Sequence, residues 1–407
     1  MANTLNLGNG NWATKEDSLL AYNSENGNFK PLPFDFTRAS SATVVNKDGL
    51  IETVGSGEPR IDFSNDAKGA LLLEPTRSNK ITYSEDFSNA SWVKLGAGTG
   101  SAAIVTSDYA ISPDGTQNAT RLQCDLNGGL TSSGNQSLIY DSYTSSGNQS
   151  ISIYVKSNTG SNQTIYFANT QTSGDTITVT SDWQRFEFSH STATYIVAIG
   201  LRGRSGGSID DNADILIYGA QVEQGSYASS YIPTQGSAVT RVADVCNNGG
   251  NEQVFNDSEG TVFINFAADF NIFDSGLPDR GISINNGSNT NSARIFQATS
   301  LNNRMAYDLD TSSGTNQVFN TSTTFADITD FNKVAFTYKQ NEFKIFLNGV
   351  QQGSTDTNGS VFSNGTLNGI SFDYGQEGNK PFFGRVKEVK YFNTALTDQE
   401  LAALTKI

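Results

Sequence analysis

Histidine and cysteine are almost absent from this 407-residue chain, which contains one His and two Cys. A Ser-His-Asp triad or a His-based metal site needs histidines at defined spacings, and only His190 is present. It follows Phe186 and Phe188 at even spacing, so we predict that His190 ends a strand and has a structural role. Cys124 and Cys246 have no second Cys or His at zinc spacing, which predicts two buried thiols rather than a disulfide scaffold.

Basic residues and long apolar runs are also scarce. The 26 Lys and Arg residues are outnumbered by 41 Asp and Glu, and the formal net charge is -15. This charge repels nucleic-acid phosphates and anionic membrane surfaces, so we expect no nucleic-acid partner. No run approaches the roughly 18 apolar residues of a membrane span, and the first residues do not resemble a signal peptide. We therefore expect no membrane insertion and synthesis in a cytoplasm.

The chain is instead rich in short segments that alternate apolar and polar residues. Residues 333–339 and 343–347 show this alternation, which is typical of half-buried strands. Gln340-Asn341-Glu342 predicts a turn between them, and Asn348-Gly349 predicts a type I′ turn after the second, because both central positions of that turn need positive φ. The segment is predicted to be a β-meander.

This meander resembles the central hairpin of the concanavalin A-like, laminin G and pentraxin jelly-roll superfamily. Residues 382–393 resemble the last strand of that group, and Val386 and Val389, three apart, predict a bulge in it. Residues 395–397 resemble the start of its closing helix, and the spacing from Thr397 to Glu400 predicts a capping box.

Residues 83–235 are rich in Ser, Thr, Asn and Gly between short apolar strands, a pattern typical of a sandwich or jelly roll. The heptapeptide Thr-Ser-Ser-Gly-Asn-Gln-Ser occurs at 131–137 and again at 144–150. That spacing is too short for a solenoid repeat, so we predict either two similar strand starts or a duplicated loop. Near the N-terminus, residues 14–17 before Leu19 predict the cap of one short helix.

The first 245 residues carry a series of distinctive short motifs. They read Phe36-Thr37-Arg38-Ala39-Ser40, Pro59-Arg60-Ile61-Asp62, Leu73-Glu74-Pro75-Thr76-Arg77, Tyr83-Ser84-Glu85-Asp86-Phe87, Tyr218-Gly219-Ala220-Gln221-Val222-Glu223 and Thr240-Arg241-Val242-Ala243-Asp244. Together they resemble the N-terminal block of bacteriophage tail-fibre, spike and head-fibre proteins. The part after Tyr83 is similar to the carbohydrate-binding-module jelly rolls embedded in such proteins. The resemblance implies a virion surface protein.

These patterns predict an all-β protein with two jelly-roll β-sandwiches in tandem after a small β-rich N-terminal region. We predict an N-terminal virion-docking region at 1–82 and a carbohydrate-binding-module-like jelly roll at 83–235. A linker at 236–260 precedes a concanavalin A-like or laminin G-like jelly roll at 261–407.

Aromatic and polar residues in the loops suggest sugar binding, because aromatic faces stack on pyranose CH groups and polar groups bond hydroxyls. The candidates are Tyr140, Tyr143, Tyr307, Asp373 and Tyr374. For any single tyrosine among them, a role in the core or at the rim of a sandwich is the more common one.

Calcium is the one metal that the sequence suggests, because hard cations prefer oxygen-rich loops. Asp210, Asp211 and Asp214 are the candidate ligands, and the resemblance adds that both families often bind calcium structurally. A solvated turn is the alternative, since the chain is rich in Asp throughout and lacks an EF-hand loop. A second acidic group comprises Asp269, Asp274 and Asp279.

By resemblance we expect a non-enzymatic tail-fibre, head-fibre or spike subunit on the virion surface. It would contact other virion proteins through its N-terminal region and bind host cell-surface glycans. Single sugar sites bind weakly, so we expect a homo-oligomer, a trimer by resemblance. Two alternatives are a decoration protein with a purely structural role and a polysaccharide depolymerase. The Glu-x-Asp-x-x-Glu motif of related glucanases does not occur in the sequence.

Overall fold

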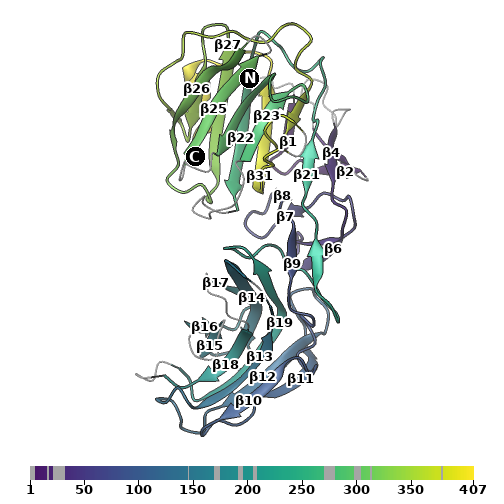
Figure 1. The fold of residues 1–407 in the computed structure, drawn as a ribbon, viewed down its shortest axis with the longest axis vertical. Coiled ribbons are helices and arrows are strands. Elements are labelled where there is room, and N and C mark those ends of the chain that lie inside the picture. The colour runs from purple at the N-terminus through teal and green to yellow at the C-terminus, as the bar shows by residue number, and fades with distance from the viewer. Residues whose placement is uncertain are drawn as a thin grey trace.

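The computed structural model contains two β-sandwiches stacked along its long axis (Figure 1). We call them the central sandwich, whose strands lie between residues 93 and 224, and the C-terminal sandwich, built mainly from residues 259–392. No helix among the described residues is long and apolar enough to span a membrane. The structure describes residues 5–15, 18–21, 33–144, 146–168, 175–190, 196–204, 209–269, 280–297, 304–311, 314–376 and 379–407.

The C-terminal sandwich packs an eight-stranded sheet on a five-stranded one. The first sheet runs in the order β29 (Val350–Gln351), β28 (Lys344–Leu347), β27 (Asn332–Lys339), β22 (Glu259–Ala268), β31 (Gly384–Phe392), β8 (Ala70–Leu73) and β7 (Ile61–Asp62), with β1 (Leu5–Gly8) also paired to β31. The second runs β26 (Gly314–Thr324), β25 (Arg304–Thr311), β24 (Ser292–Gln297), β23 (Arg280–Asn285) and β30 (Gly369–Ser371).

The central sandwich is built from two five-stranded antiparallel sheets. One runs β10 (Val93–Ala97), β13 (Gln136–Ser142), β18 (Ile196–Arg202), β15 (Gln163–Ala168) and β16 (Asp175–Val179). The other runs β11 (Ile104–Ala110), β12 (Ala119–Asp125), β19 (Asn212–Gln224), β14 (Gln149–Ser157) and β17 (Gln184–His190). Both copies of the repeated heptapeptide end in a strand start, at Gln136 and at Gln149, which confirms the first of the two predictions for them.

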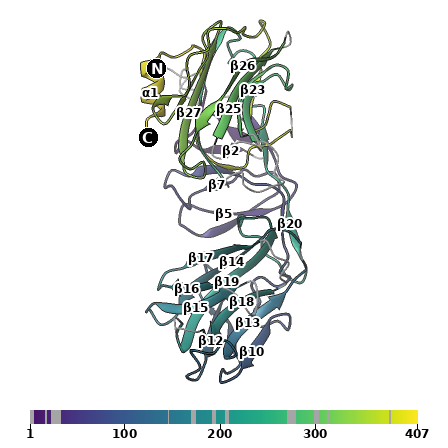
Figure 2. The same ribbon diagram turned by 60° about the vertical axis from the view of Figure 1, so that its left-hand side comes forward.

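Short strands from residues 13–79 and 239–247 connect the sandwiches. They are β2 (Ala13–Lys15), β3 (Ser18–Leu20), β4 (Pro33–Thr37) and β21 (Val245–Asn247) in one sheet, β9 (Arg77–Asn79) with β20 (Val239–Arg241), and β5 (Ala42–Val45) with β6 (Ile51–Val54). Strands β5 and β7 lie between the two sandwiches (Figure 2). The short helix predicted near residue 17 is wrong. Leu19 instead lies on strand β3 and is fully buried in the C-terminal core.

The N-terminal region is not a separate unit in the structure. Strands β1 and β8 pair with different parts of β31, so residues 5–8 and 70–73 belong to the sheet of the C-terminal sandwich. Leu5, Leu7, Leu71 and Leu73 are all at most 1% exposed and lie in the same core as the C-terminal strands. The first and last segments of the chain therefore fold together.

Local predictions for the C-terminal sandwich are confirmed. Asn348 and Gly349 have φ values of 49° and 88° in the turn between β28 and β29, as a type I′ turn requires. Strand β31 pairs with β22 through a register shift, in which Asn265 faces Glu388 and the next residue faces Val386. Helix α1 (Asp398–Thr405) begins with the capping box at Thr397.

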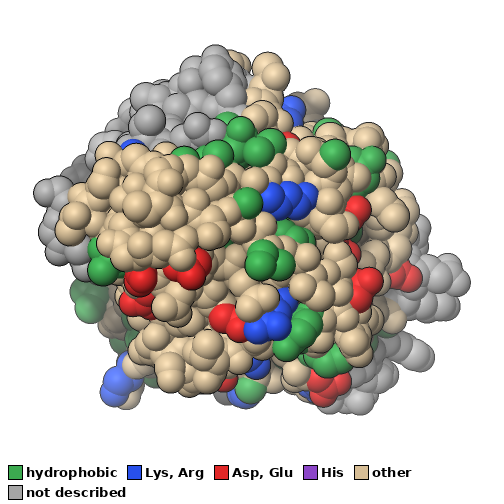
Figure 3. All heavy atoms as spheres, turned by 90° about the horizontal axis from the view of Figure 1, so that it is seen from below, with side chains coloured by type: hydrophobic (Ala, Val, Ile, Leu, Met, Phe, Trp, Pro, Cys, Tyr) green, Lys and Arg blue, Asp and Glu red, His purple; other side chains and the backbone are tan. Residues whose placement is uncertain are grey.

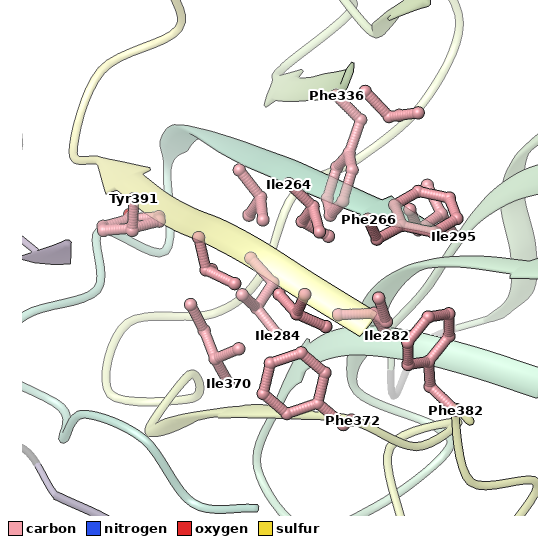
Figure 4. Packing of buried hydrophobic residues seen from close by; sticks show 14 of the residues in the cluster. Ile264, Phe266, Ile282, Ile284, Ile295, Phe336, Ile370, Phe372, Phe382 and Tyr391 are labelled. Carbon is pink, nitrogen blue, oxygen red and sulfur yellow. The ribbon is translucent and has the colours of Figure 1, made fainter. Parts of the chain in front are cut away.

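The core of the C-terminal sandwich is continuous between its sheets. Ile264 and Phe266 of β22, Ile282 of β23 and Ile295 of β24 pack together with Phe336 of β27 (Figure 4). The other face of β22 is also buried, because helix α1 covers it with Leu401. Truncation of one such buried Phe to Ala typically costs about 3–5 kcal/mol of stability.

Three arginines and two carboxylates form a buried ionic cluster where the connecting strands meet. Asp244 accepts hydrogen bonds from Arg38 (Nη1–Oδ1, 3.0 Å) and from Arg60, and Glu74 pairs with Arg60 (2.6 Å) and Arg241 (2.7 Å). All five side chains are at most 4% exposed. Burial acts to raise the pKa of Glu74, but Arg241 and Arg60 outweigh it and hold that pKa well below its usual range.

This cluster explains the motifs of the first 245 residues in physical terms. Each of its five members comes from one of those motifs, and they are brought together from positions up to 206 residues apart. Buried charges are stable only when they are paired and hydrogen-bonded. The loss of any one of these five residues would therefore leave a buried partner without its opposite charge. Cys124 and Cys246 are buried and free, as predicted.

Candidate functional site

Two of the predicted sugar-binding residues are core residues. The ring of Tyr307 on β25 is 1% exposed and lies 5.0 Å from the ring of Phe336, and its hydroxyl donates to the Thr337 carbonyl (3.2 Å). Asp373 is 1% exposed, and its Oδ1 accepts from the Gly375 N–H (2.9 Å). These positions correct the prediction, because neither side chain is accessible to a sugar.

Tyr374 is half-buried over an internal ionic cluster. Arg294 pairs with Asp308 (2.6 Å) and with Asp310 (2.5 Å). The guanidinium carbon of Arg294 lies 3.8 Å from the centroid of the Tyr374 ring, and the Lys380 ammonium lies 4.3 Å from it. The ring therefore stabilises cations of the protein itself.

The predicted tyrosines of the central sandwich also pack against its core. Tyr140 on β13 is half-buried and packs on the hydrophobic cluster. Tyr143 is 6% exposed, and burial raises the pKa of its hydroxyl well above the usual value. Sugar contact by Tyr140 and Tyr143 stays a prediction.

The three aspartates predicted to bind calcium have other partners. Asp210 and Asp211 each accept a hydrogen bond from a backbone N–H (2.8 Å), and Asp214 forms a two-pronged pair with Arg121. The bond from Arg121 lowers the pKa of Asp214. Within the described ranges, no group of three or more His, Cys, Asp or Glu side chains could hold a metal ion. Asp274 and Asp279 lie outside the described residues.

An open groove of about 650 Å³ lies beside edge strand β11 of the central sandwich. Tyr83 is half-buried in it and bridges to Gln235, while Asp86 and Asp108 are exposed. Asp108 has a φ of 50°, at a register shift that interrupts the pairing of β11 with β12. The groove is lined by Tyr83, Glu85, Asp86, Ser88, Ser107, Asp108, Asn118, Pro233, Thr234 and Gln235.

Glu85 is the partly buried acid of the groove. It accepts hydrogen bonds from the hydroxyls of Tyr231 (2.9 Å) and Tyr218 (3.2 Å), and the Tyr218 hydroxyl also lies 3.1 Å from Asp114. Burial raises the pKa of Glu85, although the two tyrosine bonds oppose this effect. No arginine or lysine pairs with Glu85 among the described residues.

Asn118 has an unused acceptor in the groove. Its Nδ2 donates to Asp114 Oδ2 (3.0 Å), while its Oδ1 is buried and has no hydrogen-bond partner in the described part of the chain. Each unsatisfied buried acceptor is costly, and Asn118 Oδ1 is one of several buried amide oxygens among the described residues that have no partner. A ligand hydroxyl would supply the missing donor.

Our sequence interpretation missed this groove, although it used Tyr83, Glu85 and Asp86 as part of a motif. The available signal was the clustering of an aromatic residue with two acids in four positions. The remaining lining residues come from segments as far away as Gln235, so their convergence could not be predicted from local sequence.

A family model described as the concanavalin A-like lectin/glucanases superfamily matches residues 266–402. The match covers the C-terminal sandwich and agrees with the resemblance of its meander and last strand. The C-terminal sandwich is therefore a lectin-like β-sandwich. No curated protein matches the chain.

Several solved carbohydrate-binding domains are similar in structure. The CBM40 of the Ruminococcus gnavus IT-sialidase, bound to α2,3-sialyllactose, has 20% identity and a TM-score of 0.32, and the match covers 38% of this chain and 86% of that one. Domain 4 of the arabinanase AbnA from Geobacillus stearothermophilus, in complex with arabinotriose, has 14% identity and a TM-score of 0.30, over 45% and 84%.

The tandem CBM22 domains of Paenibacillus barcinonensis Xyn10C have 12% identity and a TM-score of 0.26, over 79% of this chain and 99% of that one. Likenesses this distant do not establish a function. The geometry of the groove is the basis for a proposed function.

Proposed function

We propose that the protein binds glycans in the groove of the central sandwich. The observation that carries this proposal is the buried Oδ1 of Asn118, which lacks a donor and lies in an open groove with Tyr83. A sugar offers hydroxyl donors to acceptors such as Asn118, Asp86 and Asp108, and its apolar CH face can stack on a tyrosine ring. A volume of about 650 Å³ is within the range of small-molecule sites.

The test is a binding assay against a panel of bacterial surface polysaccharides that records bound protein and released oligosaccharide together. We expect binding without release. Tyr83→Ala should weaken binding at least about tenfold, which corresponds to about 1.4 kcal/mol of lost contact. Tyr109→Ala is the control, because Tyr109 is 42% exposed on β11 but does not line the groove. Equal binding by both variants would place the sugar elsewhere.

The biological setting we propose is a bacteriophage tail-fibre, head-fibre or spike subunit on the virion surface, which binds host glycans for attachment and forms a homotrimer. The motifs of the first 245 residues support this setting through their resemblance to such proteins. Mass spectrometry of purified particles would test the presence of the chain, and light scattering would test its oligomeric state. If the protein were a monomer and absent from the particles, the proposed role on the virion would be refuted, but glycan binding would not.

A depolymerase is the second candidate, and Glu85 is the observation that favours it. A carboxyl group with a raised pKa beside a second carboxyl group, here Asp114, is the arrangement of a general acid in glycoside hydrolysis. Release of oligosaccharide that Glu85→Gln abolishes would favour this reaction over simple binding. A purely structural decoration protein would bind no member of the panel.

A further inference from the structure

A second cavity lies at the junction of the two sandwiches. It has a volume of about 420 Å³ and is lined by β5 and β7, by the central sandwich with Tyr154, Arg185 and Glu187, and by Asp269 and Arg385 of the C-terminal sandwich. We call it the junction cavity. Parts of the chain from three regions must meet to form it.

Acids outnumber bases in the junction cavity. Its lining contains Asp62, Glu74, Glu187 and Asp269 against Arg185 and Arg385. Three of the acids have donors of their own. Asp62 pairs with Arg385 (2.9 Å), Glu74 belongs to the ionic cluster, and Glu187 accepts from a backbone N–H (3.2 Å).

Asp269 is the exception. Its side chain is 5% exposed, its Oδ1 lies 3.8 Å from Arg385 Nη1, and its Oδ2 is buried without a hydrogen-bond partner in the described ranges. Burial, with a smaller contribution from Glu74, raises the pKa of Asp269 to about 7. A buried carboxylate in this state is stabilised by any ligand that brings a charged donor to it.

We propose that the junction cavity binds a small organic cation of monosaccharide size, such as an amino sugar, with its ammonium group against Asp269. The buried Oδ2 of Asp269, which has no hydrogen-bond partner in the described ranges, favours a ligand with a charged donor, and this ligand competes with Arg385, Arg280 and Arg241, whose charges act on the same carboxyl group. A metal ion is disfavoured, because no three acidic side chains converge within the described residues. The hydroxyl group of Ser64 and the side-chain amide of Asn65 are exposed in the lining and can form hydrogen bonds with the hydroxyl groups of such a ligand.

Isothermal titration at pH 7.5 with D-glucosamine as the probe tests the proposal. N-acetylglucosamine and glucose, which lack the ammonium group, should bind at least about tenfold more weakly. Asp269→Asn, which keeps the shape of the side chain and removes its charge, should also weaken glucosamine binding at least tenfold.

Two further variants separate this site from others. Tyr109→Ala, which changes an exposed tyrosine outside both the groove and the cavity, should leave glucosamine binding unchanged, as should Asp66→Asn, which removes an acid that pairs with Lys387 outside the cavity. Equal affinity for glucosamine and N-acetylglucosamine would overturn the proposal. So would unchanged glucosamine binding in a folded Asp269→Asn protein, loss of binding in Tyr109→Ala or Asp66→Asn, or saturable calcium binding with no response to the amine.

Discussion

The two sandwiches use the same residue types, Tyr, Asp and Asn, in opposite ways. In the C-terminal sandwich, Arg294 pairs with two buried aspartates and contacts the ring of Tyr374, so the charges of this cluster are paired with one another. In the central sandwich, Tyr83 and Asn118 lie in an open groove where one acceptor has no partner. We infer that a polar cluster is structural when an arginine pairs with its acids, and that the composition of the loop alone does not determine this.

The exposed face at the far end of the central sandwich differs from both the ionic cluster and the groove. Apolar, basic and acidic side chains are interspersed on that face, without a large patch of any one type (Figure 3). Mixed surfaces of this kind are normal for exposed protein and do not indicate a partner. The groove differs from that face in its hollow shape and in its lining, which contains three acids and no lysine or arginine.

The largest expected effect comes from breaking the cluster in the C-terminal sandwich. Arg294→Met should lower the free energy of unfolding by about 3–5 kcal/mol, because it leaves Asp308 and Asp310 buried without their cation. Arg121→Met is the matched control. Its pair with Asp214 is about a quarter exposed, so the loss should stay near 1 kcal/mol or below. Urea unfolding of both variants would show equal losses if the comparison were wrong.

The next effect concerns Tyr374, which the sequence suggested as a sugar contact. Tyr374→Leu should destabilise the protein by about 1–2 kcal/mol, because Arg294 and Lys380 lose their contacts with the tyrosine ring. Glycan binding should not change. Thermal unfolding and the polysaccharide assay together would check this, and weakened binding at unchanged stability would restore Tyr374 as a contact residue.

Much of the fold could be predicted from the sequence, because local chemistry determines it. The Asn348-Gly349 turn, the bulge in β31 and the capping box of α1 each depend on residues close together in the chain, and each was predicted. The hairpin of β2 and β3 was not. Leu19 packs in a core formed by strands more than 200 residues away, and this contact outweighs the weak helix signal.

The site could be predicted much less well. Tyr307 has the same loop-like neighbours in the sequence as an exposed tyrosine, but alternation within β25 turns it inward beside Phe336. The partners of Asp214 and Asp244 lie 93 and 206 residues away, so their pairing with arginine was invisible in the local pattern. An acid belongs to an ion pair, rather than to an open site, when a distant segment supplies an arginine to it.

A smaller effect on stability is expected in the groove. Asn118→Ala removes one hydrogen bond that the Asn118 Nδ2 donates to Asp114 and should cost about 1 kcal/mol, since Asn118 Oδ1 has no partner to lose among the described residues. Asn158→Ala is matched to it, because Asn158 also donates one bond to an aspartate, Asp214. Both variants should lose similar stability, but only Asn118→Ala should weaken glycan binding, by about fivefold. Unaltered binding in titration calorimetry would exclude Asn118 from the site.

The smallest expected effect is a difference in pH dependence between two glutamates. Arginines hold the pKa of Glu74 below its usual range, whereas burial beside tyrosines raises the pKa of Glu85. The folded protein therefore keeps a proton on Glu85 at pH values where the unfolded chain has released it, so this residue contributes stability at low pH that is lost as the pH rises through the folded-state pKa. Glu85→Gln removes this contribution and retains an acceptor for Tyr218 and Tyr231.

The free energy of unfolding of Glu85→Gln should accordingly rise relative to the wild type as the pH increases above about 4.5, the usual glutamate pKa. The opposite trend is expected for Glu74→Gln, because the stability from an ionised Glu74 is present above the usual glutamate pKa and is lost only in acid. Urea unfolding at several pH values checks both slopes. Parallel curves for Glu85→Gln and the wild type would mean that Glu85 titrates as an ordinary surface acid, and the groove would then differ from the ionic cluster in shape alone.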